Sequence, residues 1–336
     1  MCPRKLCLPI CLLLLFRPAW SQNIPNIQLV GVGSSNPLAI YSLWFREFQK
    51  THPNLYISYM PSGSSDGIDM VSSGNADFGA TEVPMTSDQL AKAGVLQFPA
   101  LLGAVVPVYN LPGAVRSLKF SQRILAGIYL GTITRWNDPA LVSLNPEAQL
   151  PASKIVVFHS TEGRGAGYVW SDFLSKASAE WRTRVGTGTN IVWPTGVAAA
   201  GNGNLAAQVK QTPNSIGYVW FGYAVLHGLS YGSVQNSAGH FVTPDSASVA
   251  AAAVKTMPAD FRISITNPPG ERSYPIASFI WLLVPKTAES PQKQEAMRQF
   301  LNWMLTDGQT YAATFGLTPV PAAVVTKELQ TIKHIK

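Results

Sequence analysis

The sequence of 336 residues predicts an α/β fold, because short apolar runs alternate with helical patterns along the chain. Residues 27–32 form an apolar run of strand length. After them, Tyr41, Trp44, Phe45 and Phe48 recur at i, i+3, i+4 and i+7, which is the spacing of one buried helix face. A third observation is that Ser/Gly-rich loops stand where predicted strands give way to predicted helices.

The alternation continues to the end of the chain. Further strands are predicted at 55–59, 77–80, 100–108, 155–158 and 279–284. Helical segments are predicted at 68–71, 87–93 (capped by Ser87), 168–174, 247–256 and 291–305. The Gly/Thr/Asn-rich residues 186–203 are predicted to form a long loop.

Three Ser/Gly-rich loops, at 31–37, 61–67 and 160–167, carry the functional signal. Glycine lets the backbone approach a ligand closely, and the first N–H groups of a helix have no partner inside it. Such a junction suits an oxyanion, and serine hydroxyls add further donors. Three such loops predict one pocket that is closed from several sides.

Residues 1–21 are predicted to be a secretory signal peptide. Basic residues 4 and 5 precede an apolar run at 6–16, and small residues at 19 and 21 suit cleavage near Ser21–Gln22. The chain after this leader has 315 residues, which is enough for about two domains. We expect the chain to be secreted.

Composition excludes several classes of function. All three cysteines lie in the leader, so the mature chain has no disulfide, thiol nucleophile or cysteine metal site. The leader holds three basic residues and no acid, so the rest has 22 basic and 18 acidic side chains, a net charge of about +4. The basic residues are scattered, which argues against nucleic-acid binding. The histidines are isolated, so no metal and no cofactor is predicted.

At this point the residues resemble the periplasmic phosphate-binding proteins of ABC phosphate importers, a family of type II periplasmic binding proteins. The resemblance covers nearly the whole mature chain. It rests on the order and spacing of several short motifs: 31–37 (GVGSSNP), 63–65 (GSS), 76–80 (ADFGA), 97–99 (QFP), 128–138 (IYLGTITRWND), 185–189 (VGTGT), 193–196 (WPTG), 201–202 (GN) and 216–219 (IGYV).

The resemblance implies a two-lobed α/β fold, the Venus-flytrap fold, whose hinged cleft closes on phosphate. Lobe I would comprise residues 22–109 plus 274–336, and lobe II residues 110–273, with crossings near Asn110 and Tyr274. Such a protein binds rather than catalyses. It delivers its ligand to an ABC permease in the inner membrane, and we expect it to act as a monomer.

The resemblance also implies the ligand contacts, which fall at Ser35, Asn36, Ser64, Glu82, Ser160, Arg164, Gly165 and Ala166, with Ser34 as a further hydroxyl in the first loop. Ser35 replaces a threonine, Asn36 offers its backbone N–H, and Ser64 and Gly165 match. Glu82 replaces the family's aspartate, which accepts the proton of phosphate and so repels sulfate. The extra methylene moves that carboxylate by up to about 1.5 Å.

The third loop departs furthest from the family. Ser160 stands where the family has its arginine, and Arg164 and Ala166 stand where it has hydroxyl donors. In one interpretation Arg164 turns inward and replaces the missing guanidinium, oriented by Glu162 or Glu82. In the other, Arg164 pairs with Glu162 at the surface.

These departures leave other functions open. One is a binding protein for a different oxyanion or a phosphonate-like ligand, and another is a phosphate-sensing paralogue. A third belongs to a different class, because residues 63–67 match the G-x-S-x-G elbow of serine hydrolases, with Ser65 as nucleophile. That alternative needs a histidine base within reach of Ser65.

Overall fold

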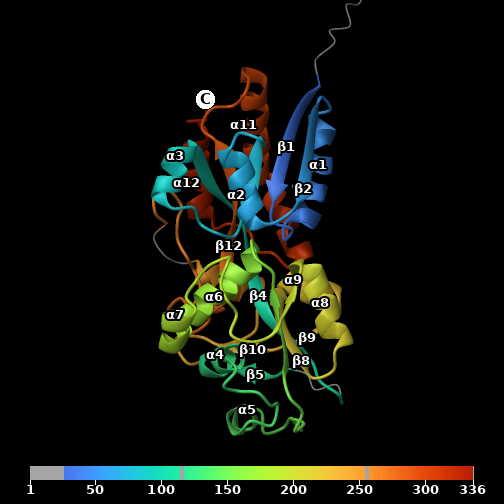
Figure 1. Ribbon diagram of the computed structural model, residues 1–336. Coiled ribbons are helices and arrows are strands. Elements are labelled where there is room, and N and C mark those ends of the chain that lie inside the picture. The colour runs from blue at the N-terminus through green and yellow to red at the C-terminus, as the bar shows by residue number, and fades with distance from the viewer. Residues whose placement is uncertain (1–25, 114–116, 254–256, 336) are drawn as a thin grey trace, which may run out of the picture.

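The computed structural model describes residues 26–113, 117–253 and 257–335. The predicted leader, residues 1–21, lies outside the described residues. Figure 1 shows two α/β bodies, one above the other. The upper body holds β1 to β3, β12, α1 to α3 and the C-terminal helices. The lower body holds the elements from β5 to α10, and β4 runs through both.

The described strands are β1 (Ile27–Gly33), β2 (Leu55–Pro61), β3 (Phe78–Thr81), β4 (Val95–Asn110), β5 (Lys119–Phe120), β6 (Val156–Ser160), β7 (Val197–Ala199), β8 (Ser215–Trp220), β9 (Ser230–Tyr231), β10 (Ser233–Gln235), β11 (Phe241–Val242) and β12 (Ala277–Pro285). The described helices are α1 (Leu38–Thr51), α2 (Ser64–Ser72), α3 (Ser87–Ala93), α4 (Gln122–Leu130), α5 (Pro139–Leu144), α6 (Gly165–Ala177), α7 (Ala179–Arg184), α8 (Gly201–Gln211), α9 (Phe221–Leu226), α10 (Ser246–Ala252), α11 (Pro291–Leu305), α12 (Ala322–Ile332) and the 3₁₀ helix η1 (Asp307–Phe315).

One sheet spans both bodies. Its strand order is β2-β1-β3-β12-β4-β8-β6-β7, and β9 pairs with β4. In the upper body β2, β1 and β3 are parallel, with Ile27 opposite Leu55 and Gly33 opposite Pro61. Because parallel strands share a direction, their carboxyl ends meet at one edge of the sheet. That edge faces the lower body in Figure 1.

Strand β4 connects the two bodies. Its residues Val95–Ala104 pair with β12, and Val105–Asn110 pair with β8. The register with β12 shifts between Leu101 and Pro99, which leaves Ala100 without a partner in β12, next to a proline whose ring nitrogen has no hydrogen to donate. All but two of the sixteen residues of β4 are buried, which confirms and extends the buried strand predicted at 100–108.

Two sequence predictions need correction. The helix at 87–93 exists, but its cap is Thr86, whose Oγ1 accepts the Gln89 N–H at 3.2 Å. The predicted loop at 186–203 is wrong in its second half, which forms β7 and the start of α8. The glycines at the start of α8 have low helix propensity, so the sequence pattern did not predict this helix. Packing stabilises it, because Leu205, Ala206 and Val209 are buried.

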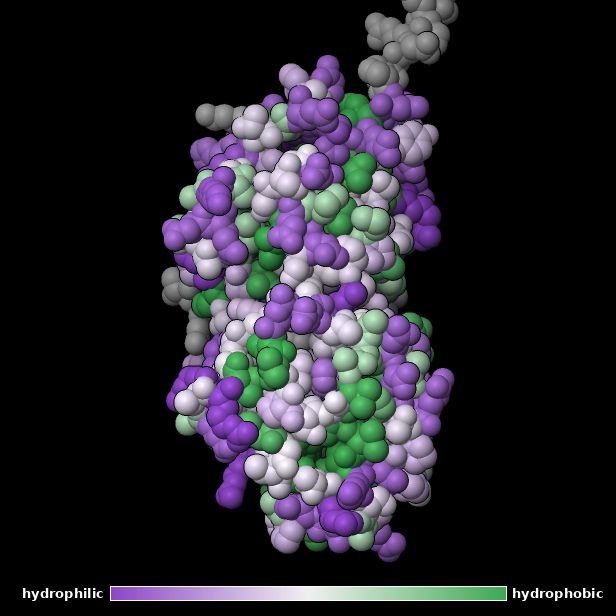
Figure 2. Space-filling model, viewed as in Figure 1, coloured by the Kyte–Doolittle hydropathy of each residue, from purple (hydrophilic) through white to green (hydrophobic). Residues whose placement is uncertain are grey.

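Aromatic side chains fill much of the core. In the lower body, Trp170 stacks on Tyr218 with ring centroids 4.8 Å apart, and both are fully buried. Figure 2 shows that hydrophilic residues cover most of the visible face of the upper body, whereas apolar residues gather on the lower body. In the described part of the chain, no helix has the length and apolar character needed to cross a membrane.

Candidate functional site

The candidate site lies where three strands of the upper body end. Ser34 follows β1, Ser64 begins α2 after β2, and Glu82 follows β3. Residues separated by up to 48 positions along the chain therefore come together at the carboxyl edge of the parallel strands. This is the edge where ligands bind in α/β sheets.

Glu82 is at the centre of this group and is fully buried. The Ser34 hydroxyl donates to Glu82 Oε1 at 2.5 Å, and the Ser64 hydroxyl donates to Oε2 at 2.6 Å. The Glu82 backbone N–H donates back to Ser64 Oγ at 3.3 Å. Each carboxylate oxygen thus has one short hydroxyl donor.

A glycine makes the close approach of β1 and β3 possible. Gly33 has φ +141°, and a Cβ on it would lie 2.1 Å from the Ala80 carbonyl oxygen. The next residue, Ser34, donates its N–H to the same oxygen at 2.9 Å. Only glycine fits this conformation and this gap, and it brings the Ser34 hydroxyl within reach of Glu82.

Two opposing effects set the ionisation of Glu82. Burial raises the pKa of its carboxyl, because the ionised form loses its hydration. The hydrogen bonds from Ser34 and Ser64 and the nearby Asn36 amide lower it, and burial is the larger effect. The carboxyl pKa therefore stays above its usual value of 4.5.

The lower body contributes the start of α6. Gly165 is its first residue, and a Cβ there would lie 1.9 Å from Glu82 Oε2 and 2.5 Å from Ser64 Oγ. Across the same junction the Ser65 N–H donates to the Gly163 carbonyl at 3.2 Å. The N-terminus of α6 is thus packed directly against the carboxylate of the upper body.

Arg164, the residue before α6, also reaches across the junction. Its Nη1 donates to the carbonyl oxygen of Ser62 in the upper body. Its Nε is buried and has no hydrogen-bond partner among the described residues. Of the ion pairs in the described part of the chain, none joins Arg164 to Glu162, so the surface pairing considered from the sequence is not the arrangement found.

Asn36 supplies two further donors. Its backbone N–H donates to Ser34 Oγ at 3.1 Å. Its side-chain Nδ2 is buried and makes no hydrogen bond of normal geometry within the described residues. A buried donor without an acceptor is costly, so Arg164 Nε is a candidate ligand contact. Asn36 Nδ2 is a second candidate, because it lies close enough to Glu82 to lower the pKa of that carboxyl.

Ser35 has partners that the sequence did not suggest. Its carbonyl accepts the Tyr223 hydroxyl at 3.2 Å, and its Oγ accepts Asn202 Nδ2 at 3.5 Å. Both partners belong to the lower body, so they join the bodies on a second side of the junction. The motif Gly201-Asn202 was visible in the sequence, but no signal pointed to Tyr223.

Ser160 and Ala166 contribute differently from the other candidates. The Ser160 hydroxyl lies 2.9 Å from the Tyr218 hydroxyl, and the Ser160 N–H donates to it at 3.0 Å. Within the described residues no hydrogen bond joins Ser160 to Glu82. Ala166 is buried in α6 next to Gly165 and offers only its backbone.

Other chemistry has little support at this junction. Ser65 Oγ contacts Thr189 Oγ1 at 3.4 Å, and no hydrogen bond in the described chain links it to a histidine. Over residues 26–113, 117–253 and 257–335, no three His, Cys, Asp or Glu side chains gather into a group that could hold a metal ion. The groups that the described residues bring together at this junction are hydrogen-bond donors and one carboxylate.

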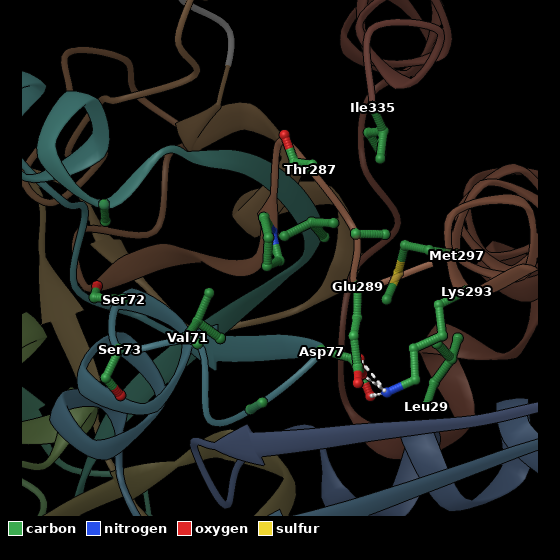
Figure 3. Close-up of a pocket in the computed structure, with 16 residues that line it drawn as sticks. Leu29, Val71, Ser72, Ser73, Asp77, Thr287, Glu289, Lys293, Met297 and Ile335 are labelled. Atoms are coloured by element: carbon green, nitrogen blue, oxygen red, sulfur yellow. Dashed lines mark hydrogen bonds and ion pairs between the residues drawn. The ribbon is translucent and has the colours of Figure 1, made fainter. Parts of the chain in front are cut away.

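A hollow of about 440 Å³ in the upper body is separate from this junction (Figure 3). Its charged residues are already paired, because Lys293 lies 2.9 Å from Asp77 and 2.7 Å from Glu289. Asp77 directly precedes β3, whereas Glu82 directly follows it, so the hollow lies at the other end of that strand.

Residues 21–308 match a family model described as the PBP superfamily domain. The chain is 38% identical over 303 residues to the phosphate-binding protein PstS of Pasteurella multocida, covering 89% of this chain and 88% of that protein. It is 37% identical over 315 residues to PstS of Xylella fastidiosa, covering 92% and 85% of the two chains.

The structure is also similar to a phosphate-binding protein from Stenotrophomonas maltophilia, with a TM-score of 0.72, 18% identity, and 90% and 93% of the chains covered. At this identity the likeness concerns the fold. It confirms the two-lobed α/β architecture predicted from the sequence.

Proposed function

Because this chain belongs to the PBP superfamily and to the family of the PstS phosphate-binding proteins, we propose that it captures inorganic phosphate between its two bodies. It then delivers phosphate to the permease of an ABC importer. It is a binding protein rather than an enzyme, it acts as a monomer in the periplasm, and residues 1–21 direct its export.

The observation that carries this proposal is the convergence of buried donors on one point of the junction. The Ser34 and Ser64 hydroxyls donate to Glu82, and the Asn36 amide is close enough to lower the pKa of Glu82. Arg164, whose Nε has no hydrogen-bond partner among the described residues, directly precedes Gly165. The N-termini of α2 and α6 meet there as well. Hydroxyls, a guanidinium and helix N-termini are the groups that bind oxyanions in a desolvated site.

Glu82 makes phosphate a better candidate than sulfate. A monohydrogen phosphate can donate its O–H to a carboxylate, whereas sulfate has no proton to donate at neutral pH. A carboxylate facing sulfate leaves an unrelieved repulsion in a buried site. The proposed ligand contacts are therefore Ser34, Ser35, Asn36, Ser64, Glu82, Arg164 and the backbone of Gly165 and Ala166, with Ser160 beside them.

The proposed lobes follow the predicted division at 22–109 plus 274–336 and 110–273. Binding requires the lobes to separate and close, as hinged two-domain proteins do. Exposed apolar side chains on the lower body, Val192, Val197, Val225 and Leu226, offer surface for contact with a membrane permease.

Isothermal titration of the protein from residue 22 onward tests the proposal, with phosphate, arsenate, sulfate and methylphosphonate as titrants. We expect phosphate and arsenate to bind at micromolar concentration or below, with sulfate much weaker. Preferential binding of methylphosphonate would favour the alternative ligand class. No heat with any anion would overturn the proposal.

A further inference from the structure

Residues 257–262 follow the lower body in the sequence, but they lie against the upper body. Lys327 on α12 donates from its Nζ to the carbonyl oxygens of Met257 and Pro258, each at 2.8 Å. The same ammonium group lies over the Phe261 ring, 5.6 Å from its centroid. Because these residues belong to the proposed lobe II, their contacts with α12 link the two lobes.

Phe261 is buried in the upper body and is only 1% exposed. Its ring packs on Phe98 of β4 with centroids 6.2 Å apart, and its carbonyl accepts the Trp281 indole N–H at 3.4 Å. Its φ of +58° is a left-handed conformation that bulky residues rarely adopt, and such a conformation persists only where surrounding contacts impose it. Phe261 is therefore an anchor in the upper body.

The residues that follow are bound to the lower body instead. The hydroxyls of Ser264 and Thr266 both donate to Asp172 Oδ2 on α6. Lys176, one turn further along α6, donates from its Nζ to Thr266 Oγ1 at 2.7 Å and lies 2.9 Å from Asp172 Oδ2. An anchor in the upper body and an anchor in the lower body are thus only three positions apart in the chain.

Both anchors lie away from the point where β4 passes from one body to the other. That point is between Ala104 and Val105, where β4 changes its partner from β12 to β8. Phe98 lies six residues before Ala104, which at about 3.3 Å per residue is about 20 Å along the strand. The lower anchor is on α6, whose first residue, Gly165, is at the candidate site. A link placed this far from the crossing restrains a rotation that the crossing alone would permit.

We propose that residues 257–262 form a strap that limits how far the cleft opens, with Phe261 as its anchor in the upper body. This inference rests on the hinged opening that is part of the proposed function. Opening moves α6, and with it Asp172, away from the upper body. Three residues of extended chain span at most about 11 Å, so a wider separation of Phe261 from Ser264 requires one anchor to break.

The first test measures the opening without any ligand. The protein from residue 22 onward has no cysteine, so Lys92→Cys on α3 and Arg184→Cys on α7 allow one spin label on each body. Both positions are exposed, and both helices lie on the left in Figure 1. Double electron–electron resonance then gives the distance between the two labels in protein dialysed free of phosphate.

Two variants of this labelled protein each release one anchor. Phe261→Ala removes the upper anchor, and Ser264→Ala combined with Thr266→Val removes the hydroxyls of the lower one. The matched control is Phe300→Ala on α11, which removes an equally buried phenylalanine of the upper body that lies outside the strap. We expect a longer and broader distance distribution in both anchor variants, and the wild-type distribution in Phe300→Ala.

Wild-type distances in both anchor variants would overturn the strap, and so would an equal lengthening in Phe300→Ala, which would attribute the effect to lost stability. Thermal unfolding shows whether each variant folds. If Phe261→Ala does not fold, the double variant of the lower anchor decides the question by itself, because its substitutions leave the upper-body core intact.

The second test adds phosphate to the same proteins. Phosphate should restore the wild-type distance in both anchor variants, and titration calorimetry should show affinity about ten-fold weaker if the conformation that can close falls to about a tenth of the population. If no protein binds phosphate, the proposed function fails, and the distances measured without phosphate still decide whether the strap limits opening. If phosphate binds and those distances equal wild type, the strap fails and the proposed function stands.

Discussion

The strongest prediction concerns Gly165, where a single methyl group should block closure without harming the fold. In Gly165→Ala the new Cβ would lie 1.9 Å from Glu82 Oε2, 2.5 Å from Ser64 Oγ and 2.9 Å from Glu82 Cδ. Ordinary contact distances are about 3.5 Å or more, so the methyl group would be about 1.6 Å too close to Glu82 Oε2. An anion oxygen in place of Oε2 would meet the same obstruction.

The size of the effect follows from the cost of overpacking. An extra methyl group in a well-packed site costs about 1–3 kcal/mol. The clash is between a residue of the lower body and a residue of the upper body. It therefore arises only when the two bodies are closed, and it lowers the stability of the closed state alone. We therefore expect phosphate affinity to fall by about 5- to 150-fold, because each 1.4 kcal/mol is a factor of ten.

Titration calorimetry measures the affinity for phosphate, and thermal unfolding of the ligand-free protein shows whether the variant is as stable as wild type. The matched control is Gly203→Ala in α8, where a Cβ would meet no atom within 4 Å. Gly203→Ala should leave affinity unchanged and slightly raise stability, since alanine favours helix. Wild-type affinity in Gly165→Ala would refute the close approach of α6 to Glu82.

Two further predictions concern charged groups. Arg164→Ala removes the buried Nε, which has no partner among the described residues, and the hydrogen bond to the Ser62 carbonyl. Phosphate affinity should fall by about 10- to 150-fold, as expected for losing a charged hydrogen bond of 1.5–3 kcal/mol. Arg184→Ala, which removes an exposed positive charge from the same body, should bind normally. Unchanged affinity in Arg164→Ala would show that this guanidinium does not contact the anion. Glu328 is fully buried in α12, neither carboxyl oxygen has a partner among the described residues, and burial raises its pKa well above 4.5. The folded state therefore keeps a proton that the unfolded state has lost, so its stabilising contribution is present below about pH 4.5 and declines as the pH rises toward the folded-state pKa. Glu328→Met should raise the free energy of unfolding at pH 8 by about 1–3 kcal/mol and flatten its dependence on pH, as measured by urea denaturation at pH 5 and pH 8. An equal slope in variant and wild type would contradict this account.

The strand and helix alternation was predictable because it depends on local patterns. The buried face of α1 and the strands at 27–32 and 279–284 follow from periodicity over a few residues, and the structure contains them. The first half of α8 was not predictable, since its glycines lack helix propensity and tertiary packing of Leu205 and Val209 stabilises it.

The candidate site was predictable in its members but not in its pairing. The loops after β1 and β2 and the residue after β3 were found from Ser/Gly composition and from the resemblance. That Ser34 and Ser64 both donate to Glu82 depends on the register of three strands and on the Glu82 rotamer, which local sequence does not encode. The same holds for Ser160, which packs on Tyr218, 58 residues away along the chain.

By itself, the sequence determined the α/β class, the three Ser/Gly-rich loops and the family of this protein, because these depend on residue types and their order. Only the tertiary structure decided which side chains of these loops contact one another. It placed a carboxylate, two hydroxyls and the start of α6 at one buried point, where both hydroxyls donate to Glu82 at 2.5–2.6 Å. Contacts between distant segments arise from packing and strand register, which local sequence does not specify.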